Sequence, residues 1–416
     1  MAEGHHHELN VEHAVSSSWR MPQASARSLA AVPNTNVFLA GSFLPDSAKN
    51  QVHVLQFADE ENELLLLKSL ALPPDSGPVA SIAVSPKQPY TTAFVTGWRR
   101  DDGAVWISKK PGNELKDQSN YEEDGVFARC SACSSCRGTS GGTTSTASSA
   151  PSSASNSSTS FTNLSWHHCQ WDPFESSRLL VASRDGATVC AVDTQRNAVV
   201  RTIGKEALTK STASGSTTSV ESSAQQDQQR SVLHAIAYDT HHSNVFAVGL
   251  NADLKICDLR TGGSSAASFA AKMECRDAHA FGLTAVQFNP NVPNQLLTGG
   301  EDAAFKIWDL RNTQTACVHH TSSAHSHWIT AVAHNPFHDQ LVLTAGSDCQ
   351  VNLWRTKKEQ NQNFSLSKNL KQVSQEDAVY SVAWSGNDAW VYCSLSYDGV
   401  VTACRVPMEE KYRILL

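Results

Sequence analysis

An internal repeat of 46 residues in the C-terminal half of the chain constrains the fold more than any other sequence feature. Four residue types recur at this spacing, as His279, Thr298, Asp302 and Trp308 and again as His325, Thr344, Asp348 and Trp354. Each unit holds short runs of β-branched and aromatic residues, separated by turn-forming pairs such as Asn-Pro and Asp-Gly. The repeat therefore predicts a stack of small β-units, each too small to bury its own apolar faces alone.

The order of the four residue types resembles the signature of WD repeats, whose period is 40 to 50 residues. In such repeats the four side chains form a hydrogen-bond relay inside one blade of a β-propeller. A buried carboxylate is costly unless it accepts several hydrogen bonds, so a complete relay would hold its turn rigidly. We expect this relay in both of the units that carry all four residues.

The other units carry weaker versions of the signature. Asp398 stands at the turn position of the unit after the second complete one, but Gln375 replaces its histidine and Cys404 replaces its tryptophan. In an earlier unit, Cys257 replaces the tryptophan and Ala247 the strand threonine. We expect these relays to be incomplete.

Working backwards along the chain gives seven units in all. The fold predicted is therefore all-β, a seven-bladed WD40 propeller that forms a single domain over residues 1–416. Two low-complexity segments, 113–160 and 206–230, interrupt it; between residues 140 and 160, 14 of 21 residues are serine or threonine. Such segments cannot bury enough apolar surface to offset their backbone entropy, so we expect disordered insertion loops.

A propeller must also seal its first blade to its last, because an open ring exposes a sheet edge. The first blade already has four predicted strands between residues 28 and 70, whereas the last has three. Two segments could supply the missing strand: residues 8–17, with Leu9, Val11 and Val15, or the more apolar residues 411–416. We favour the N-terminal segment as the closing strand, with the C-terminal tail packed nearby.

Composition narrows the class of protein. The chain has 416 residues, a formal charge of −7 and 11 cysteines. A mild negative charge argues against a dedicated nucleic-acid binder, which usually carries a basic stripe. Sparse cysteines in an odd number fit reduced thiols. Since no apolar run could span a membrane and residues 1–10 lack the apolar core of a secretory signal, we expect a soluble intracellular protein.

Sequences near the C-terminus allow a narrower comparison. The chain reads Leu-Ser-Tyr-Asp-Gly up to Gly399 and ends in Lys-Tyr-Arg-Ile-Leu-Leu from Lys411 to Leu416. With these motifs it resembles the family of EARP- and GARP-complex-interacting proteins, WD-repeat factors of endosomal recycling. The resemblance runs from about Ala26 to the C-terminus and leaves out the serine-rich insertions.

The resemblance implies an adaptor and not an enzyme. Members of the family bind multisubunit tethering complexes that capture vesicles at recycling endosomes and the trans-Golgi network, and they support cargo recycling and secretory-granule maturation. We therefore expect a cytoplasmic protein, peripheral at those membranes. We also expect no cofactor, no metal and no nucleic acid as partner. No lipidation signal is visible, so membrane association is expected to be indirect, and the propeller is expected to be monomeric.

Three aromatic residues are candidates for partner binding. Phe281, Trp328 and Tyr380 fall just before or within the inner strands of successive blades. This region of a propeller faces the rim of the central channel, where exposed aromatic side chains would be good anchors. Packing between blades is the alternative role.

Two Trp-Asp-x-Arg-like boxes suggest a different function. They end in Arg260 and Arg311 and resemble the box by which some WD proteins dock on the DDB-type adaptor of cullin ubiquitin ligases. An exposed arginine could form charge-assisted pairs with such a partner. The alternative is a salt bridge between the aspartate and the arginine of the same box.

The Cys130, Cys133 and Cys136 cluster raises the possibility of a structural zinc site. Close thiol spacing suits tetrahedral zinc, and residues 167–169, His-His-Cys, could supply a fourth ligand. However, the fourth ligand would lie about 30 residues away, so reduced cysteines in an insertion are the favoured interpretation.

A Gly-x-Ser-x-Gly string at residues 138–142 formally matches a hydrolase nucleophile elbow. That elbow needs a strand before it and a helix after it, and neither is predicted here. We therefore treat the match as chance.

Overall fold

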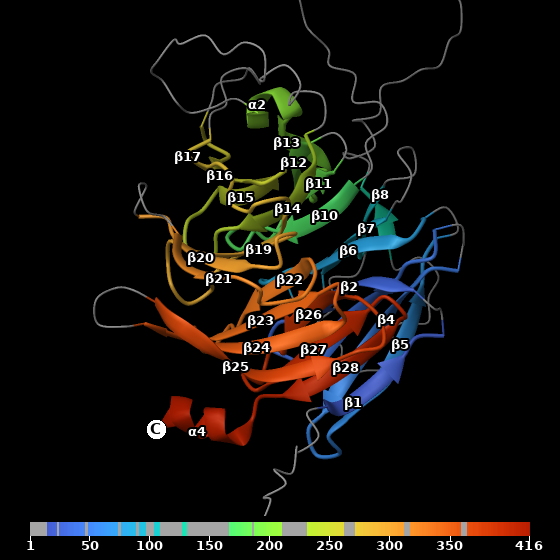
Figure 1. Ribbon diagram of the computed structural model, residues 1–416. Coiled ribbons are helices and arrows are strands. Elements are labelled where there is room, and N and C mark those ends of the chain that lie inside the picture. Colours follow the sequence, from blue (N-terminus) through green and yellow to red (C-terminus); the bar gives the residue numbers. More distant parts are fainter. Residues whose placement is uncertain are drawn as a thin grey trace, which may run out of the picture.

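The computed structural model describes thirteen segments of the chain, namely residues 15–22, 25–45, 49–73, 76–88, 91–96, 104–108, 127–130, 166–184, 187–209, 231–261, 271–311, 317–358 and 364–416. These residues form 28 strands and two short helices. The strands build seven four-stranded antiparallel sheets, the blades, which follow one another in chain order (Figure 1). The predicted seven-bladed WD40 propeller is confirmed.

The innermost strand of every blade packs against the innermost strand of the next, and the last packs against the first, which closes the ring. From blade 1 to blade 7 the inner strands are β2 (Ala26–Ala31), β6 (Val79–Val84), β10 (Trp166–Trp171), β14 (Leu233–Tyr238), β18 (Leu283–Phe288), β22 (Ile329–His334) and β26 (Val379–Trp384).

The second strands are the most deeply buried part of the fold. They are β3 (Val37–Ser42), β7 (Thr92–Thr96), β11 (Arg178–Ser183), β15 (Val245–Leu250), β19 (Gln295–Gly300), β23 (Leu341–Gly346) and β27 (Val391–Ser396). Every residue of β3, β15, β19, β23 and β27 is buried. A strand with partners on both edges and a blade on each face has no solvent side, so its sequence is an apolar run rather than an alternating one.

The outer half of each blade completes the sheet. The third strands are β4 (Gln51–Ala58), β8 (Ala104–Ser108), β12 (Thr188–Asp193), β16 (Asp253–Asp258), β20 (Phe305–Asp309), β24 (Gln350–Lys358) and β28 (Val400–Arg405). The outermost are β5 (Glu63–Ala71), β9 (Phe127–Arg129), β13 (Ala198–Ile203), β17 (Met273–Cys275), β21 (Cys317–Thr321), β25 (Phe364–Ser374) and, in blade 7, β1 (Val15–Arg20).

The N-terminal segment closes the ring, as expected. Strand β1 pairs antiparallel with β28. The Leu64 backbone N–H donates to Ser17 Oγ at 3.0 Å, and the Trp19 ring lies 5.1 Å from that of His53, so β1 also contacts blade 1. The strand lies later than the predicted residues 8–17, of which 8–14 fall outside the described residues. Its contacts explain the shift, because Trp19 packs into the core between blades 7 and 1.

The C-terminal residues form a helix, α4 (Met408–Leu415), and not a strand. Ile414 packs on the core of blades 6 and 7, and Arg355 of β24 donates to Glu410 Oε2 at 2.5 Å. The tail therefore packs against the propeller, as predicted (Figure 1).

Parts of both predicted insertion segments belong to the propeller. Residues 127–129 form β9 within the segment 113–160, and the backbone N–H of Cys130 donates to Val105 O at 2.7 Å. The segment 206–230 overlaps helix α2 (Lys205–Thr209), whose Ala207 and Leu208 are buried in the core of blades 3 and 4. The serine-rich residues 140–160 and 211–224 lie outside the described residues.

Within the described part of the chain, neither helix has the length and the apolar character needed to cross a bilayer.

Candidate functional site at the mouth of the central channel

Every inner strand carries an irregularity at its second residue. In β2, for example, Ala26 pairs with Ser42 and Ser28 pairs with Gly41, so Arg27 is left out of the ladder. A bulge of this kind re-aims a side chain. The seven residues that stand at this bulge position, one in each blade, are Arg27, Ala80, His167, His234, Thr284, Thr330 and Tyr380.

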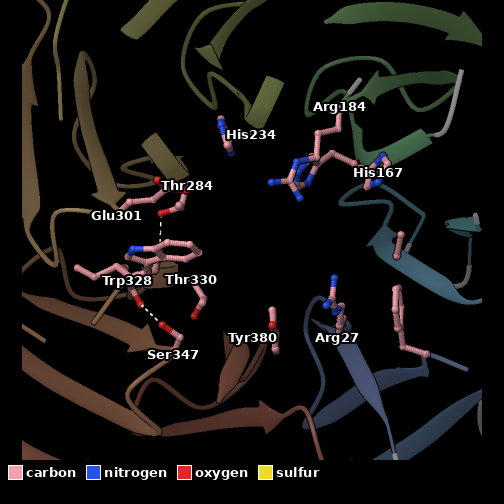
Figure 2. Close-up of a pocket in the computed structure, with 14 residues that line it drawn as sticks. Arg27, His167, Arg184, His234, Thr284, Glu301, Trp328, Thr330, Ser347 and Tyr380 are labelled. Atoms are coloured by element: carbon pink, nitrogen blue, oxygen red, sulfur yellow. Dashed lines mark hydrogen bonds between the residues drawn. The ribbon is translucent and has the colours of Figure 1, made fainter. Parts of the chain in front are cut away.

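All seven bulge residues line one cavity of about 370 Å³. Four further lining residues, Phe43, Arg184, Glu301 and Ser347, directly follow second strands, and Trp328 directly precedes β22. The cavity is therefore the mouth of the central channel, at the end where inner strands begin (Figure 2). Because all seven blades contribute, the closed ring is needed to form it.

One side of the mouth is rich in nitrogen-bearing side chains. Arg27 comes from blade 1, His167 and Arg184 from blade 3, and His234 from blade 4, whereas Glu301 is the single carboxylate among the described lining residues. His168 also lines the cavity. This balance is opposite to that of the whole chain, whose formal charge is −7.

Two histidines of this cluster, His168 and His234, are neutral at physiological pH. Burial, followed by the electrostatic effects of His167 and Arg184, lowers the pKa of His168 to about 4. Burial and then Arg184 lower the pKa of His234 to about 4. The two arginines carry positive charge in the mouth, and the neutral imidazoles of His168 and His234 offer hydrogen-bonding nitrogens beside them.

Arg27 lies among three aromatic rings. Its guanidinium carbon lies 4.5 Å from the ring centroid of Phe43, 4.7 Å from that of Tyr380 and 5.4 Å from that of Tyr397. Cation–π contacts of this length are favourable and fix the orientation of the guanidinium. Tyr380, expected to bind a partner, thus lines the mouth and also holds Arg27.

Of the other two predicted aromatic anchors, Trp328 lines the cavity and Phe281 does not. Trp328 lines the cavity with 48% of its surface exposed, on the side opposite Arg184 (Figure 2). Phe281 is 69% exposed but is not among the lining residues; it lies just before β18, at the same end of the neighbouring blade. The threonines have a structural role, since Thr284 Oγ1 donates to Ile329 O in the next blade at 2.5 Å.

Both expected relays have the predicted geometry. In blade 6, the Trp354 indole N–H donates to Thr344 Oγ1 at 2.8 Å, and His325 Nε2 lies 2.8 Å from the same oxygen. His325 Nδ1 lies 2.9 Å from Asp348 Oδ1. In blade 5, the corresponding distances are all 2.8 Å in the set His279, Thr298, Asp302 and Trp308.

The relays position the rim of the mouth. Asp348 directly follows Ser347, and Asp302 directly follows Glu301, which both line the cavity. Burial alone would raise the pKa of Asp348, but hydrogen bonds from His325 and from the Ser326 backbone N–H hold it below its usual value. The carboxylate therefore stays ionised and fixes the turn.

The weaker blades make different contacts at the relay positions. In blade 7, Gln375 Nε2 donates to Ser394 Oγ at 2.5 Å, and Asp398 pairs with Arg20 of the closing strand at 3.0 Å. In blade 4, strand register places Val248, and not Ala247, at the strand threonine position, which corrects the sequence assignment by one residue.

Arg260 and Arg311 lie away from this mouth. Each follows a third strand, and since neighbouring strands are antiparallel, third strands end on the opposite face of the ring. Arg260 is held by Asp258 through Nε–Oδ1 at 3.0 Å and a second contact at 2.8 Å. Asp309 holds Arg311 in the same way, with contacts of 2.9 and 2.5 Å. The structure therefore has the salt bridge that was the alternative interpretation of these boxes.

The zinc hypothesis concerns residues that the structure mostly leaves out. Cys133, Cys136 and the serine elbow at 138–142 lie outside the described residues. Cys130 is buried between blades 2 and 3, and burial raises the pKa of Cys169 to about 12, so that thiol is protonated. Among the described residues, no group of three or more His, Cys, Asp or Glu side chains could hold a metal ion.

Sequence reasoning found Trp328 and Tyr380 but missed the cationic side of the mouth. Arg27, His167 and His234 share one signal, since each is the second residue of an inner strand. Aligning the seven units on that position would have found them.

Comparison with known proteins agrees with this fold. Residues 192–354 match the family model described as EIPR1 beta-propeller, and residues 367–402 match the WD domain, G-beta repeat. The resemblance predicted from the sequence is thereby confirmed over residues 192–354.

Individual relatives carry related names. The chain is similar to EARP-interacting protein 1 of Caenorhabditis elegans, with 33% identity over 34% of this chain and 44% of that protein. It is also similar to EARP and GARP complex-interacting protein 1 of Homo sapiens, with 56% identity over 10% of this chain and 11% of that protein. The matched segments thus span less than half the length of these relatives.

Proposed function

This chain is related over residues 192–354 to the EIPR1 β-propeller family, and we propose from that relationship that it is a non-enzymatic adaptor for a vesicle-tethering complex of the EARP or GARP type. The family match is the observation that carries the proposal. The printed names of the relatives describe interaction with such complexes, which supports the same partner class.

The geometry of the mouth is compatible with an adaptor. A closed propeller is a rigid platform, and Trp328 presents a large aromatic surface to solvent at its mouth. Exposed tryptophan in a concave site is a common anchor for protein partners.

The proposal extends to cellular role. The protein would support endosomal recycling and trafficking at the trans-Golgi network and in secretory granules. It would act as a monomeric propeller in the cytoplasm, peripheral at those membranes, and would reach them through its protein partners.

Affinity purification of the full chain followed by mass spectrometry tests this function. We expect subunits of the tethering complex among the recovered proteins, at levels well above those for an unrelated seven-bladed propeller. Recovery of a cullin with its DDB-type adaptor, and no tethering subunits, would overturn the proposal and favour the ubiquitin-ligase alternative.

A further inference from the structure

We propose that the mouth of the central channel binds an acidic segment of a protein partner, whose carboxylates face Arg184 and Arg27 while an apolar side chain packs on Trp328. This inference rests on the proposed adaptor function and adds to it the chemistry of the segment that is recognised.

Charge is the first argument. Two arginines and three histidines gather within one cavity, with Glu301 as the single described carboxylate among the lining residues. The three histidines and Arg184 come from blades 3 and 4 alone, so imidazole nitrogens lie on the same side of the mouth as the Arg184 guanidinium. An anion in the mouth would face the guanidinium groups of Arg184 and Arg27, and in a partly enclosed site it would be attracted more strongly than on an open surface.

The opposite side of the mouth supplies the second argument. Trp328 exposes about half of its surface there, and Phe281 of the neighbouring blade exposes more than two thirds. Burial of such rings is favourable by roughly 25 cal/mol for each Å² of apolar surface removed from water. A small inorganic anion would gain nothing from these rings, whereas a peptide with acidic and apolar side chains would gain from both sides.

The size of the cavity also favours a short peptide segment as the ligand. A volume of about 370 Å³ lies at the lower end of ligand pockets, so it takes a few side chains and not a folded domain. Since the cavity opens at the end where inner strands begin, the rest of the segment would run across the rim, where Phe281 lies.

A binding assay with the purified full chain tests the proposal. The probe is a fluorescein-labelled peptide of four Glu-Leu repeats, followed by fluorescence polarisation. The comparison peptide has four Gln-Leu repeats, which keeps the apolar side chains and removes the charge. We expect the acidic peptide to bind at least about tenfold more tightly, and its affinity to fall as salt rises from 50 to 300 mM because exposed charges are screened.

Variants locate the binding site. Arg184→Gln and Trp328→Ala should each weaken the acidic peptide about tenfold. The matched controls lie on the opposite face: Arg260→Gln removes an exposed arginine, and Phe337→Ala removes an aromatic ring, 46% exposed, just past the other end of β22. Both controls should leave affinity unchanged.

Three outcomes would overturn the proposal: equal binding of the two peptides, equal effects of mouth and control variants, or displacement of the peptide by millimolar inorganic phosphate, which would indicate a small-anion site. Its failure is separable from that of the adaptor function. Tethering subunits recovered equally by the wild type and by Arg184→Gln would leave the function standing and remove this site, whereas peptide binding without tethering subunits would do the reverse.

Discussion

The Asp348 carboxylate joins the segment before β22 to the turn between β23 and β24. It lies at hydrogen-bond distance from the His325 ring and accepts from the backbone N–H groups of Ser326 and Gln350. Replacing Asp348 by Ala leaves these donors unsatisfied, and we expect a loss of about 1–3 kcal/mol in unfolding free energy, measured by urea titration. Asp398→Ala should cost less, because Arg20, a main partner of Asp398, is more than half exposed.

Asp348→Asn provides a control, since an amide keeps the shape and one acceptor oxygen. It should fall between the wild type and Asp348→Ala. Equal losses for Asp348→Ala and Asp398→Ala would contradict our assignment of a complete relay to blade 6 and an incomplete one to blade 7.

His334 is buried at the end of inner strand β22. It is 2% exposed, and neither ring nitrogen has a hydrogen-bond partner among the described residues. The same strand position is Phe288 in blade 5 and Trp384 in blade 7, so an aromatic ring fits there. Replacing His334 by Phe removes two unsatisfied nitrogens and should raise the unfolding free energy by on the order of 1 kcal/mol at pH 7.5.

Thermal and urea unfolding at that pH measure the difference between His334→Phe and the wild type. A loss of stability would show that the larger ring overpacks this position.

At the scale of elements, the repeat spacing located all seven blades but not every strand boundary. Short strands such as β9, with three residues, carry too little pattern to distinguish them from a loop, so the sequence predicts an insertion over residues 127–129. Helix α2 was missed because its five residues pack through Ala207 and Leu208 alone. In both cases tertiary contacts, and not the local sequence, decide the secondary structure.

The closing strand gives the sharpest prediction at this scale. Deleting residues 1–20 removes β1 and exposes the edge of β28 together with part of the core that Trp19 covers. We expect a fall in melting temperature of more than about 5 °C, because even a few kcal/mol shifts a domain of this size by several degrees. Deleting residues 408–416, which removes α4 and no strand, should cost less.

Differential scanning calorimetry compares the two truncations. If loss of the N-terminal residues left the melting temperature unchanged, β1 would not seal the ring in solution.

At the scale of the whole molecule, the ring was predictable from sequence and the charge of its mouth was not. The relay residues lie within one unit each, so their spacing is visible along the chain. By contrast, Arg27 and His234 lie more than 200 residues apart in sequence and meet in one cavity because the ring closes. Moreover, each occupies a bulge, and bulges depend on strand register, which a sequence pattern does not specify.

Burial of histidines throughout the ring predicts how the whole protein responds to acid. Burial lowers the pKa of His53, His168 and His234 to about 4 and that of His334 to about 3. In the unfolded chain each would titrate near 6.5, so the unfolded state binds more protons as the pH falls. Their contribution to stability is therefore complete above pH 6.5 and is lost as the pH falls towards 4.

Carboxylates act below this window, because the lowered pKa of Asp348 matters only beneath its unfolded value near 4. We expect the unfolding free energy to fall steeply between pH 6.5 and 4.5, with up to about 1.4 kcal/mol per pH unit from each fully buried histidine such as His334. Urea titrations at half-unit steps measure this slope, and His334→Phe should reduce it by about that amount. A stability that stays constant across these pH values would show that the histidines remain accessible to protons in the folded ring.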